Sequence, residues 1–318
     1  EPQPIRALFA IGINAAMWPN TARMYQALEA LDFFACVDFF LTETAKRADI
    51  VLPAATSLER EALVAYPGCQ FRGEVRYRDA VLAPRGEARA DAQISLDIAV
   101  ALGMGEDFWH GDLAAAWAEA AEGLEPEIRR QAYEDPDGAT VFADALDEEG
   151  FEGQRLYEVR GFPTATGRIE FDSRELRDAG HDGLPVWREP AESPVSKPER
   201  AAEYPLVLTS GGRSKYYTHS QQQRFPSTRA ADPVPRATIH PETAAEYGIA
   251  HGEPVRVRTQ RGAVVFHAEV ADTVAPGVVH CVHGWAEAEI NRLTDDAHLD
   301  PISGFPPFKS GLCRVEPV

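Results

Sequence analysis

Near the start of the chain the spacing of apolar residues changes twice, which is typical of a region where short strands and helices alternate. Apolar residues fill positions 33–37 and 50–52; the first run is short and sharply bounded and predicts a buried parallel strand, and the second predicts a further strand. Thr42 lies between them and can cap a short helix, while Pro53 ends the second run. The first run ends at Asp38, so the predicted strand carries a carboxylate at its C-terminal tip. Strand, short helix and strand make an α/β unit of the kind that binds nucleotides at strand C-termini.

Another strand and helix precede this unit. Residues 6–11 predict a strand, and apolar residues at helical spacing predict a helix that begins near Thr21. Between them lies a turn that contains Gly12 and Asn14. Glycine permits a tight turn that a ligand can approach closely, and the N-terminus of the following helix suits a phosphate. A glycine that serves only the turn itself is the alternative interpretation.

The middle of the chain predicts more helix than strand. Periodic apolar residues predict a helix through Ile94 and Leu102 that ends at Gly103, and Asp112 caps another. A further helix is predicted over residues 57–63. The other expectations are irregular structure over 71–91, peripheral helix and loop over 125–153, a turn at 166–167 followed by a strand, and a proline-rich linker over 185–204.

The last third of the chain has mainly the pattern of β-structure. A strand over 205–210 ends in the pair Gly211 and Gly212. Alternating valines on both sides of Arg261 predict a hairpin, and 277–282 predict a further strand. We therefore expect a small β-barrel rather than a sandwich. The polar run after the glycine pair has more hydrogen-bonding capacity than a surface loop needs, which indicates a polar heterocycle over the backbone.

Composition sets the scale and the electrostatics. With 318 residues the chain is long enough for about two domains with cores of their own. Its formal net charge of −19 excludes the broad basic field by which nucleic acids are bound, so we expect no nucleic-acid partner. Any anionic ligand must be held by local groups. No apolar run approaches the roughly 18 residues of a membrane-spanning helix, so we expect no membrane span.

The cysteines and histidines do not predict a metal site. The four cysteines are far apart and include no CxxC pair, which excludes an iron–sulfur or structural zinc motif within this stretch and leaves the compartment undecided. In the segment HCVHG, Cys281 and His283 share one face of a predicted strand while His280 points away. At most two ligands converge there, so we assign no metal ligand and no catalytic residue.

The carboxylate at the end of the first apolar run suits a purine better than a phosphate. Guanine presents two adjacent N–H donors that one ionised carboxylate accepts as a bidentate pair, so Asp38 would read guanine and reject adenine. The hydroxyls of Thr42 and Thr44 add polar contacts. The alternative is that Asp38 only caps the helix that follows it.

Several motifs carry a family resemblance, and they occur in the family's order over nearly the whole chain. The motifs are GIN, DFFLTETAKRADIVLPAAT, SLERE, TATGRIEF, YPLVLTSGGRSKYYTHSQ, HGW, NRLTDD, DPISGFPPFK and LCRV. With them the chain resembles the C-terminal half of the molybdopterin oxidoreductases, the dimethyl sulfoxide reductase superfamily. The resemblance implies a bis(molybdopterin guanine dinucleotide) cofactor with molybdenum or tungsten.

The resemblance also implies a fold of class α/β plus mainly β. Residues 1–130 would be the second half of a nucleotide-binding α/β domain, 131–203 a peripheral and linking segment, and 204–318 a double-psi β-barrel that closes over the pterins. The chain opens at Glu1 without an initiator methionine, so we expect a piece of a longer polypeptide. The family's molybdenum ligand and iron–sulfur cysteines would lie in the upstream part.

The resemblance further implies which residues contact the cofactor. Gly12 and Asn14 match the turn that lines one dinucleotide, and Asp38 matches the guanine-reading carboxylate. Contacts from residues 66–76 are not predicted, because the family's usual order of glycine, arginine and glutamine is absent there. The other matching positions are Thr42 and Asp49 near Asp38, then Arg213, Tyr217, Thr218, His219, Ser220 and Gln221 in the pterin-contacting loop, and Asn291 and Lys309 in the tail that reaches the other dithiolene arm.

These features predict the cofactor-binding C-terminal portion of a molybdenum oxidoreductase that performs two-electron redox or oxygen-atom transfer at the metal. By itself the segment would lack the molybdenum ligand and be inactive. Its partners would be the N-terminal remainder of the enzyme and an iron–sulfur electron-transfer subunit. The alternative is a non-catalytic dinucleotide-binding module or a subunit of a larger complex. An unrelated guanine-nucleotide enzyme would need a glycine-rich phosphate loop with lysine, which the sequence lacks.

Overall fold

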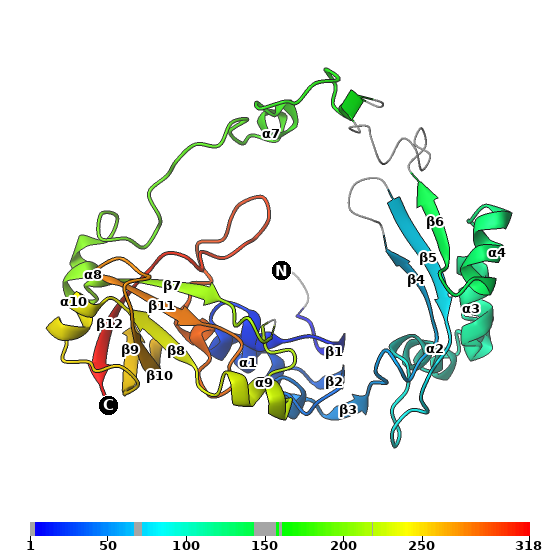
Figure 1. Ribbon diagram of the computed structural model, residues 1–318, viewed down its shortest axis with the longest axis horizontal. Coiled ribbons are helices and arrows are strands. Elements are labelled where there is room, and N and C mark those ends of the chain that lie inside the picture. Colours follow the sequence, from blue (N-terminus) through cyan, green and yellow to red (C-terminus); the bar gives the residue numbers. More distant parts are fainter. Residues whose placement is uncertain (1–3, 67–71, 143–156, 159–160, 218) are drawn as a thin grey trace. The chain divides into compact units, whose positions relative to one another are not determined.

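The computed structural model describes residues 4–66, 72–142, 157–158, 161–217 and 219–318 (Figure 1). The chain divides into two compact units. One unit is discontinuous and combines Glu1–Val51 with Trp187–Val318, and the other is Leu52–Val186. Every described residue of the predicted cofactor site belongs to the discontinuous unit, so the construction of that unit positions the site.

A small sheet and one helix form the N-terminal part of the discontinuous unit. The strands β1 (Ala7–Ile11), β2 (Phe33–Asp38) and β3 (Ile50–Pro53) form a sheet in that order, with β1 and β2 parallel. The helix α1 (Thr21–Glu29) packs Tyr25 and Leu28 against Phe34 of β2. All three predicted strands and this helix are therefore confirmed. The short helix predicted between β2 and β3 is a single 3-10 turn, η2 (Ala45–Arg47).

The C-terminal part of the same unit is a closed barrel of six strands, which confirms the predicted small β-barrel (Figure 1). Around the barrel the strand order is β10-β8-β11-β7-β12-β9; β10 and β8 are parallel, as are β11 and β7. Closure pairs both edges of each strand, so this sheet has no open edge. The strands are β7 (Leu206–Gly212), β8 (Arg236–Ile239), β9 (Pro254–Thr259), β10 (Gly262–Val270), β11 (Val278–Val282) and β12 (Gly311–Pro317).

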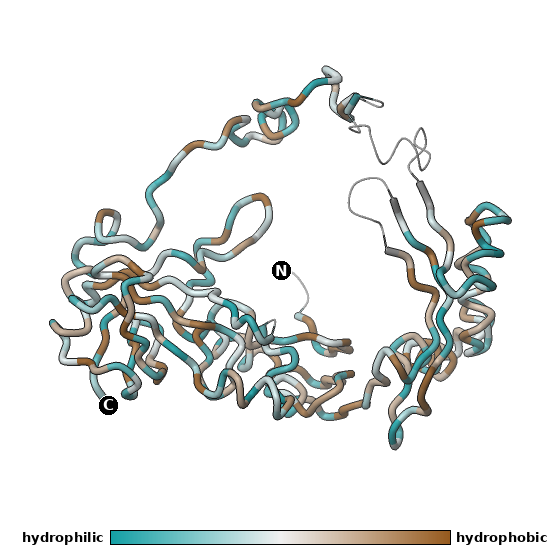
Figure 2. The backbone as a smooth tube through the Cα atoms, in the orientation of Figure 1, coloured by the Kyte–Doolittle hydropathy of each residue, from teal (hydrophilic) through white to brown (hydrophobic). Residues whose placement is uncertain are grey.

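Alternation places one face of each barrel strand in the core. On β9, Val255 and Val257 are fully buried while the arginines beside them lie at the surface, and β11 likewise buries Val279 and Cys281. Figure 2 shows hydrophobic stretches along the barrel strands. The sequence period of two is thus the direct cause of the barrel core. Short helices complete this part, namely α8 (Pro198–Glu203), α9 (Pro226–Ala231), α10 (Pro241–Glu246) and η5 (Ile290–Leu293).

The second unit contains an antiparallel sheet and several helices. Its strands are β4 (Ala62–Tyr66), β5 (Arg72–Arg78) and β6 (Ala139–Phe142), in the order β4-β5-β6. Asp112 accepts the N–H of Ala115 at 3.0 Å, so the predicted cap of α3 is confirmed. Within the described ranges, no helix is long and apolar enough to cross a bilayer. The helices are α2 (Asp91–Ala101), η3 (Gly105–Asp107), η4 (Trp109–Gly111), α3 (Leu113–Ala120), α4 (Pro126–Glu134) and α7 (Arg174–Asp178).

Two predictions for the start of this unit are wrong. Residues 57–63 do not form a helix, because Glu59 accepts the N–H of Thr56 at 2.9 Å and its hydroxyl at 2.8 Å and so closes a turn. The chain then continues as β4. Residues 72–78, predicted to be irregular, form β5, in which arginines on one face hid the alternation that buries Val75.

Two further predictions need correction. The turn at 166–167 is present, but no strand follows it; instead the hydroxyl of Thr164 donates to the carbonyl of Arg168 at 2.7 Å and folds the segment back on itself. In the barrel, β7 extends two residues beyond the predicted strand and includes the whole glycine pair. The predicted linker over 185–204 contains the short helix α8.

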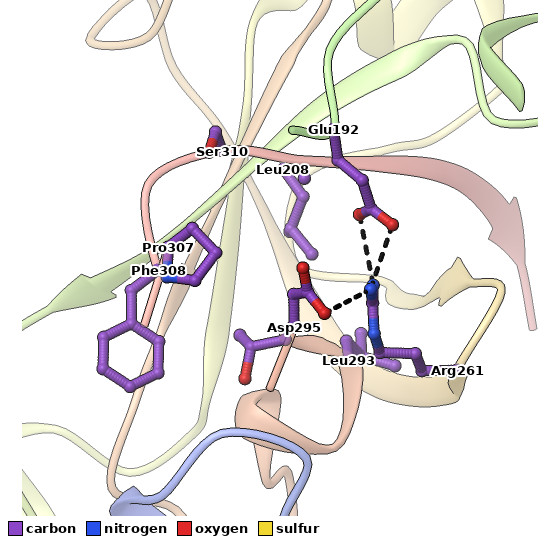
Figure 3. A pocket seen from close by; sticks show the side chains of 10 residues that line it. Glu192, Leu208, Arg261, Leu293, Asp295, Pro307, Phe308 and Ser310 are labelled. Carbon is purple, nitrogen blue, oxygen red and sulfur yellow. Dashed lines mark hydrogen bonds and ion pairs between the residues drawn. The ribbon is translucent and has the colours of Figure 1, made fainter. Parts of the chain in front are cut away.

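A buried ionic network fastens the linker and the C-terminal tail to the barrel (Figure 3). Arg261, in the turn between β9 and β10, contacts Glu192 of the linker at 3.0 Å and Asp295 of the tail at 2.9 Å. The side chains of Glu192 and Asp295 are only 5% and 3% exposed. Because removing one partner leaves buried charges without compensation, this network holds both segments in place.

Replacing Arg261 therefore should destabilise the barrel strongly. We expect Arg261→Met to lower the free energy of unfolding by about 3 kcal/mol, since two buried carboxylates lose their shared partner. The measurement is urea denaturation of both proteins followed by circular dichroism. Arg256→Met is the matched control, because Arg256 pairs with Glu316 at 3.8 Å near the surface and its loss should cost about 1 kcal/mol or less. Equal effects of the two substitutions would contradict this account.

Candidate cofactor-binding site

The turn after β1 brings two predicted residues to the barrel. Gly12 has a φ of +61°, which favours glycine, and its N–H donates to the carbonyl of Val37 at 2.9 Å, joining the ends of β1 and β2. A Cβ atom at Gly12 would meet no atom within 4 Å, so the turn faces open space. The side-chain amide of Asn14 donates to the hydroxyl of Ser220 in the barrel. The structure thus brings together Asn14 and Ser220, two of the residues predicted to contact the cofactor.

The carboxylate of Asp38 is held at the tip of β2 with accepting capacity to spare. One oxygen accepts the N–H of Phe39 at 2.7 Å, and the other accepts the hydroxyl of Thr42 at 3.1 Å. The side chain is half-buried. A carboxylate oxygen has two lone pairs, so one position on each oxygen stays open to a bidentate donor. Asp38 therefore stabilises its own loop, as the alternative interpretation holds, and can still receive a ligand.

Asp49 lies away from Asp38. Its carboxylate accepts the N–H of Phe34 at 2.7 Å, and its own N–H donates to the carbonyl of Phe34 at 2.8 Å. Phe34 and Asp38 are separated by four residues of strand, a distance of about 13 Å. The structure gives Asp49 the task of fixing the start of β2, and it does not bring this side chain to the site.

The glycine pair at the end of β7 makes room for two basic side chains. Lys309 donates from Nζ to the carbonyl of Ser210 at 2.7 Å. A Cβ atom at Gly211 would lie 3.1 Å from that Nζ, and one at Gly212 would lie 2.1 Å from Nε2 of His280. Any larger residue at either position would displace a neighbouring basic group. The tail and the strand β11 thus meet at this end of β7.

Two histidines form a close pair beside the glycines. Nδ1 of His219 lies 2.7 Å from Nε2 of His283, and the rings are stacked with centroids 4.8 Å apart. His219 has a φ of +52°, and a Cβ atom at Gly284 would lie 2.2 Å from its carbonyl oxygen. Glycine at 284 is therefore required for the loop to reach this position. His283 was not predicted as a site residue, although the segment HCVHG gave it a place on the strand.

Positive charge gathers around this pair in a strongly acidic chain. Burial, together with the nearby charges of His219, Arg213 and Lys309, lowers the pKa of His283 to about 4. Within the described part of the chain, Arg213 and Lys309 form no ion pair with a carboxylate. Two cations that no described carboxylate neutralises, held next to neutral imidazoles, make a local site for an anion.

The remaining predicted residues have different fates. Tyr217 lies in the barrel core, where its hydroxyl donates to Asp232 at 3.0 Å and its ring meets Trp285 edge to face. Asn291 is 2% exposed and donates to the carbonyl of Ala16 at 3.0 Å. Both side chains hold neighbouring segments in place, and their predicted contact with the cofactor stays a prediction. Gln221 is exposed on the same loop as Ser220, and Thr218 lies outside the described residues.

Sequence reasoning missed the contacts that join α1 to the tail. Tyr25 donates its hydroxyl to Glu289, and the guanidinium of Arg47 lies 3.5 Å from the centre of the Tyr25 ring. Asn20 also donates to Asp296 at 3.0 Å. Tyr25 and Glu289, like Asn20 and Asp296, are more than 260 residues apart in the chain, so no local pattern could have indicated these contacts.

Comparisons with known proteins agree with this arrangement. A molybdopterin oxidoreductase family model matches residues 1–101, and a molydopterin dinucleotide binding domain model matches residues 206–312. The acetylene hydratase of Syntrophotalea acetylenica is 30% identical over 98% of this chain and 44% of its own length. The assimilatory nitrate reductase catalytic subunit of Bacillus subtilis is 31% identical over 99% of this chain and 42% of its own length.

A solved structure extends the likeness to the fold. The acetylene hydratase from Pelobacter acetylenicus superposes with a TM-score of 0.81 at 28% identity, over all of this chain and 45% of that one. The chain thus spans less than half the length of the relatives it matches. It belongs to the molybdopterin oxidoreductases, and its barrel is a dinucleotide-binding domain of that family. The predicted cofactor class, molybdopterin guanine dinucleotide with molybdenum, is confirmed at the level of the family.

The glycine at 284 gives a test of the loop geometry. We expect Gly284→Ala to lower the free energy of unfolding by about 3 kcal/mol or more, because left-handed backbone strain adds to a clash with the His219 carbonyl. Gly304→Ala is the control, since Gly304 also has a positive φ but open space around it, and its cost should be about 1 kcal/mol. Thermal unfolding measures both, and equal losses would contradict the packing described.

The histidine pair predicts a pH dependence. Folding keeps His283 neutral, with its pKa lowered to about 4, so between about pH 6.5 and 4 the unfolded chain binds more protons there. Stability from this group is complete above pH 6.5 and falls by about 3 kcal/mol as the pH drops to 4. In His283→Gln this part of the pH dependence should vanish. Parallel curves of unfolding free energy against pH for both proteins would refute the assignment.

Proposed function

We propose that this chain is the cofactor-binding portion of a larger molybdenum enzyme and that it holds the guanine dinucleotides of a bis(molybdopterin guanine dinucleotide). The observation that carries the proposal is the convergence of Arg213, Lys309 and the pair His219 and His283 at one end of the barrel, next to Asn14. An anionic dinucleotide needs such a local positive site, because the chain as a whole repels anions.

The chemistry of the side chains fits the two ends of a dinucleotide. Asp38 offers a carboxylate with open acceptor positions to the donors of guanine, and Thr42 holds it in place. The open turn at Gly12 lets a ligand approach the backbone closely. Arg213 and Lys309 neutralise diphosphate, and Ser220, Gln221 and Thr218 supply polar groups for the edges of the pterin.

Some predicted residues have a supporting task in this proposal. Tyr217 anchors the pterin-contacting loop through Asp232, and Asn291 ties the tail to the turn after β1. Asp49 fixes the start of β2 and makes no cofactor contact. When bound, the molybdenum centre supplies two-electron redox chemistry, usually with oxygen-atom transfer. The residues of this chain bind and orient it and exclude water around it.

The domain division belongs to the same proposal. We assign residues 1–130 to the α/β domain, 131–203 to a peripheral and linking segment, and 204–318 to a barrel of the double-psi type. The relatives' greater length supports an N-terminal remainder as the main partner, which would carry the molybdenum ligand. An iron–sulfur subunit that delivers electrons is the further partner that this function requires.

One assay distinguishes the proposed cofactor-binding portion of an enzyme from a non-catalytic module. A non-catalytic module would hold no metal, and the family of the chain argues against it. One relative is a hydratase, so a shared cofactor does not fix the reaction type. The test is the molybdenum and released GMP content of the full-length polypeptide, purified from cells that make the cofactor. About two GMP for each molybdenum support the proposal, and the absence of both overturns it.

The guanine assignment makes its own prediction. In the full-length protein, Asp38→Ala should reduce retained GMP because two charge-assisted hydrogen bonds are lost, which corresponds to roughly a hundredfold weaker binding. Asp32→Asn is the matched control, because Asp32 is an exposed carboxylate at the other end of β2 that pairs with Arg6. Unchanged GMP content in the Asp38 variant would contradict the assignment.

A further inference from the structure

Large apolar side chains remain exposed beside the candidate guanine-reading carboxylate. Phe39, Phe40 and Leu41 directly follow Asp38 in the chain and are 55%, 41% and 56% exposed. Phe225, the residue before α9 in the barrel part, is 46% exposed. Contiguous exposed apolar surface of this kind marks a place where something binds.

Two of these side chains, from distant parts of the sequence, are in contact. The rings of Phe40 and Phe225 meet edge to face with centroids 6.2 Å apart, and the guanidinium of Arg224 lies 5.9 Å from the centre of the Phe40 ring. The loop that carries Phe40 is held in place, because Thr42 donates its N–H to the Phe40 carbonyl at 2.8 Å and its hydroxyl to Asp38. The aromatic surface and the carboxylate therefore keep a defined spacing.

We propose that Phe40, Phe225 and Arg224 form an aromatic wall against which the base read by Asp38 stacks. The inference rests on the proposed function and adds residues to its guanine end. The α/β part would read the edge of the base through Asp38, and the barrel part would supply a share of the stacking face through Phe225 and Arg224. Purines stack on aromatic rings and under guanidinium groups whatever their edge, so this wall supplies affinity and Asp38 supplies selectivity.

A purine suits this place better than a covering protein segment does. Asp38 keeps open acceptor positions, and within the described residues Arg224 forms no ion pair. An apolar protein face packed over Phe40 and Phe225 would bury both charged groups without compensation, which costs several kcal/mol. A guanine instead offers two donors to the carboxylate and a π-face to the cation. The base would also contact two segments that lie about 185 residues apart in sequence, so its binding would hold them together.

The test is calorimetric titration of the full-length polypeptide, made in cells that lack the cofactor, with GDP, ADP and inorganic pyrophosphate. We expect Phe40→Ala and Phe225→Ala to weaken GDP binding roughly 5- to 150-fold, as expected for the loss of one stacking contact, and to leave pyrophosphate binding unchanged. They should weaken ADP by the same factor, so the preference for GDP over ADP persists. Asp38→Asn should instead reduce that preference.

Two further variants control for misfolding and for the loss of any exposed phenylalanine. Phe40→Leu keeps apolar volume but removes the ring, so it should fold as the wild type does and still lose affinity for GDP. Phe171→Ala, an 81% exposed phenylalanine of the other unit, should change none of the titrations. Circular dichroism checks the fold of each variant.

The outcomes separate this inference from the proposed function. Wild-type protein from cofactor-making cells that contains neither molybdenum nor GMP overturns the proposed function and the wall with it. Protein that contains both, combined with GDP affinities of Phe40→Leu and Phe225→Ala equal to wild type, overturns only the wall. Loaded wild type whose cofactor-free form fails to bind GDP also overturns the wall, and so does an equal loss of pyrophosphate in the phenylalanine variants.

Discussion

The site depends on keeping positive charge unpaired inside a chain whose net charge is −19. Buried carboxylates of the barrel part contribute to this because they already pair with other arginines. Asp232 pairs with Arg236, Asp295 with Arg261, and Glu289 with Arg292. Arg213 and Lys309 are therefore left without an ion pair among the described residues, next to histidines that burial keeps neutral. An incoming anion finds charge that the protein has not already neutralised.

The discontinuous unit turns two separate sequence regions into one binding surface. Polar contacts between the α/β part and the barrel part fasten them directly at the site, among them Asn14 to Ser220 and Asn291 to Ala16. The ionic network at Arg261 fastens the tail through Asp295 and the linker through Glu192. Tyr217 and Asn291, which were predicted to touch the cofactor, also fix the shape of this surface through Asp232 and the Ala16 carbonyl. The positions of the side chains that bind the ligand thus depend on other side chains that need not contact the ligand.

The barrel also shows why a small sheet can carry a charged site at its end. Closure removes open edges, and the alternating strands fill the interior with apolar side chains such as Val255 and Phe266. The loops beyond the strands add a few side chains such as Tyr217 to the core and otherwise can present hydrogen-bonding groups. Glycines at 211 and 212 let the backbone approach basic side chains that a larger residue would displace, and Gly284 lets it approach the backbone of His219. The strands thus carry the apolar core in the barrel interior and the candidate site at one end of the barrel.

The sequence by itself determined the elements with a clear period and the chemistry at their ends. Short apolar runs predicted β1 to β3, alternating valines predicted the barrel hairpin, and Asp38 stood out as a carboxylate at a strand tip. Local patterns failed where charged residues masked alternation, as in β5, or where a side chain closed a turn, as Glu59 does. Only the tertiary structure decided that Asp49 is remote from Asp38, that His219 and His283 pair, and that Phe40 meets Phe225. The reason is physical: periodicity records which face of an element is buried, whereas contacts between distant residues depend on how the elements pack.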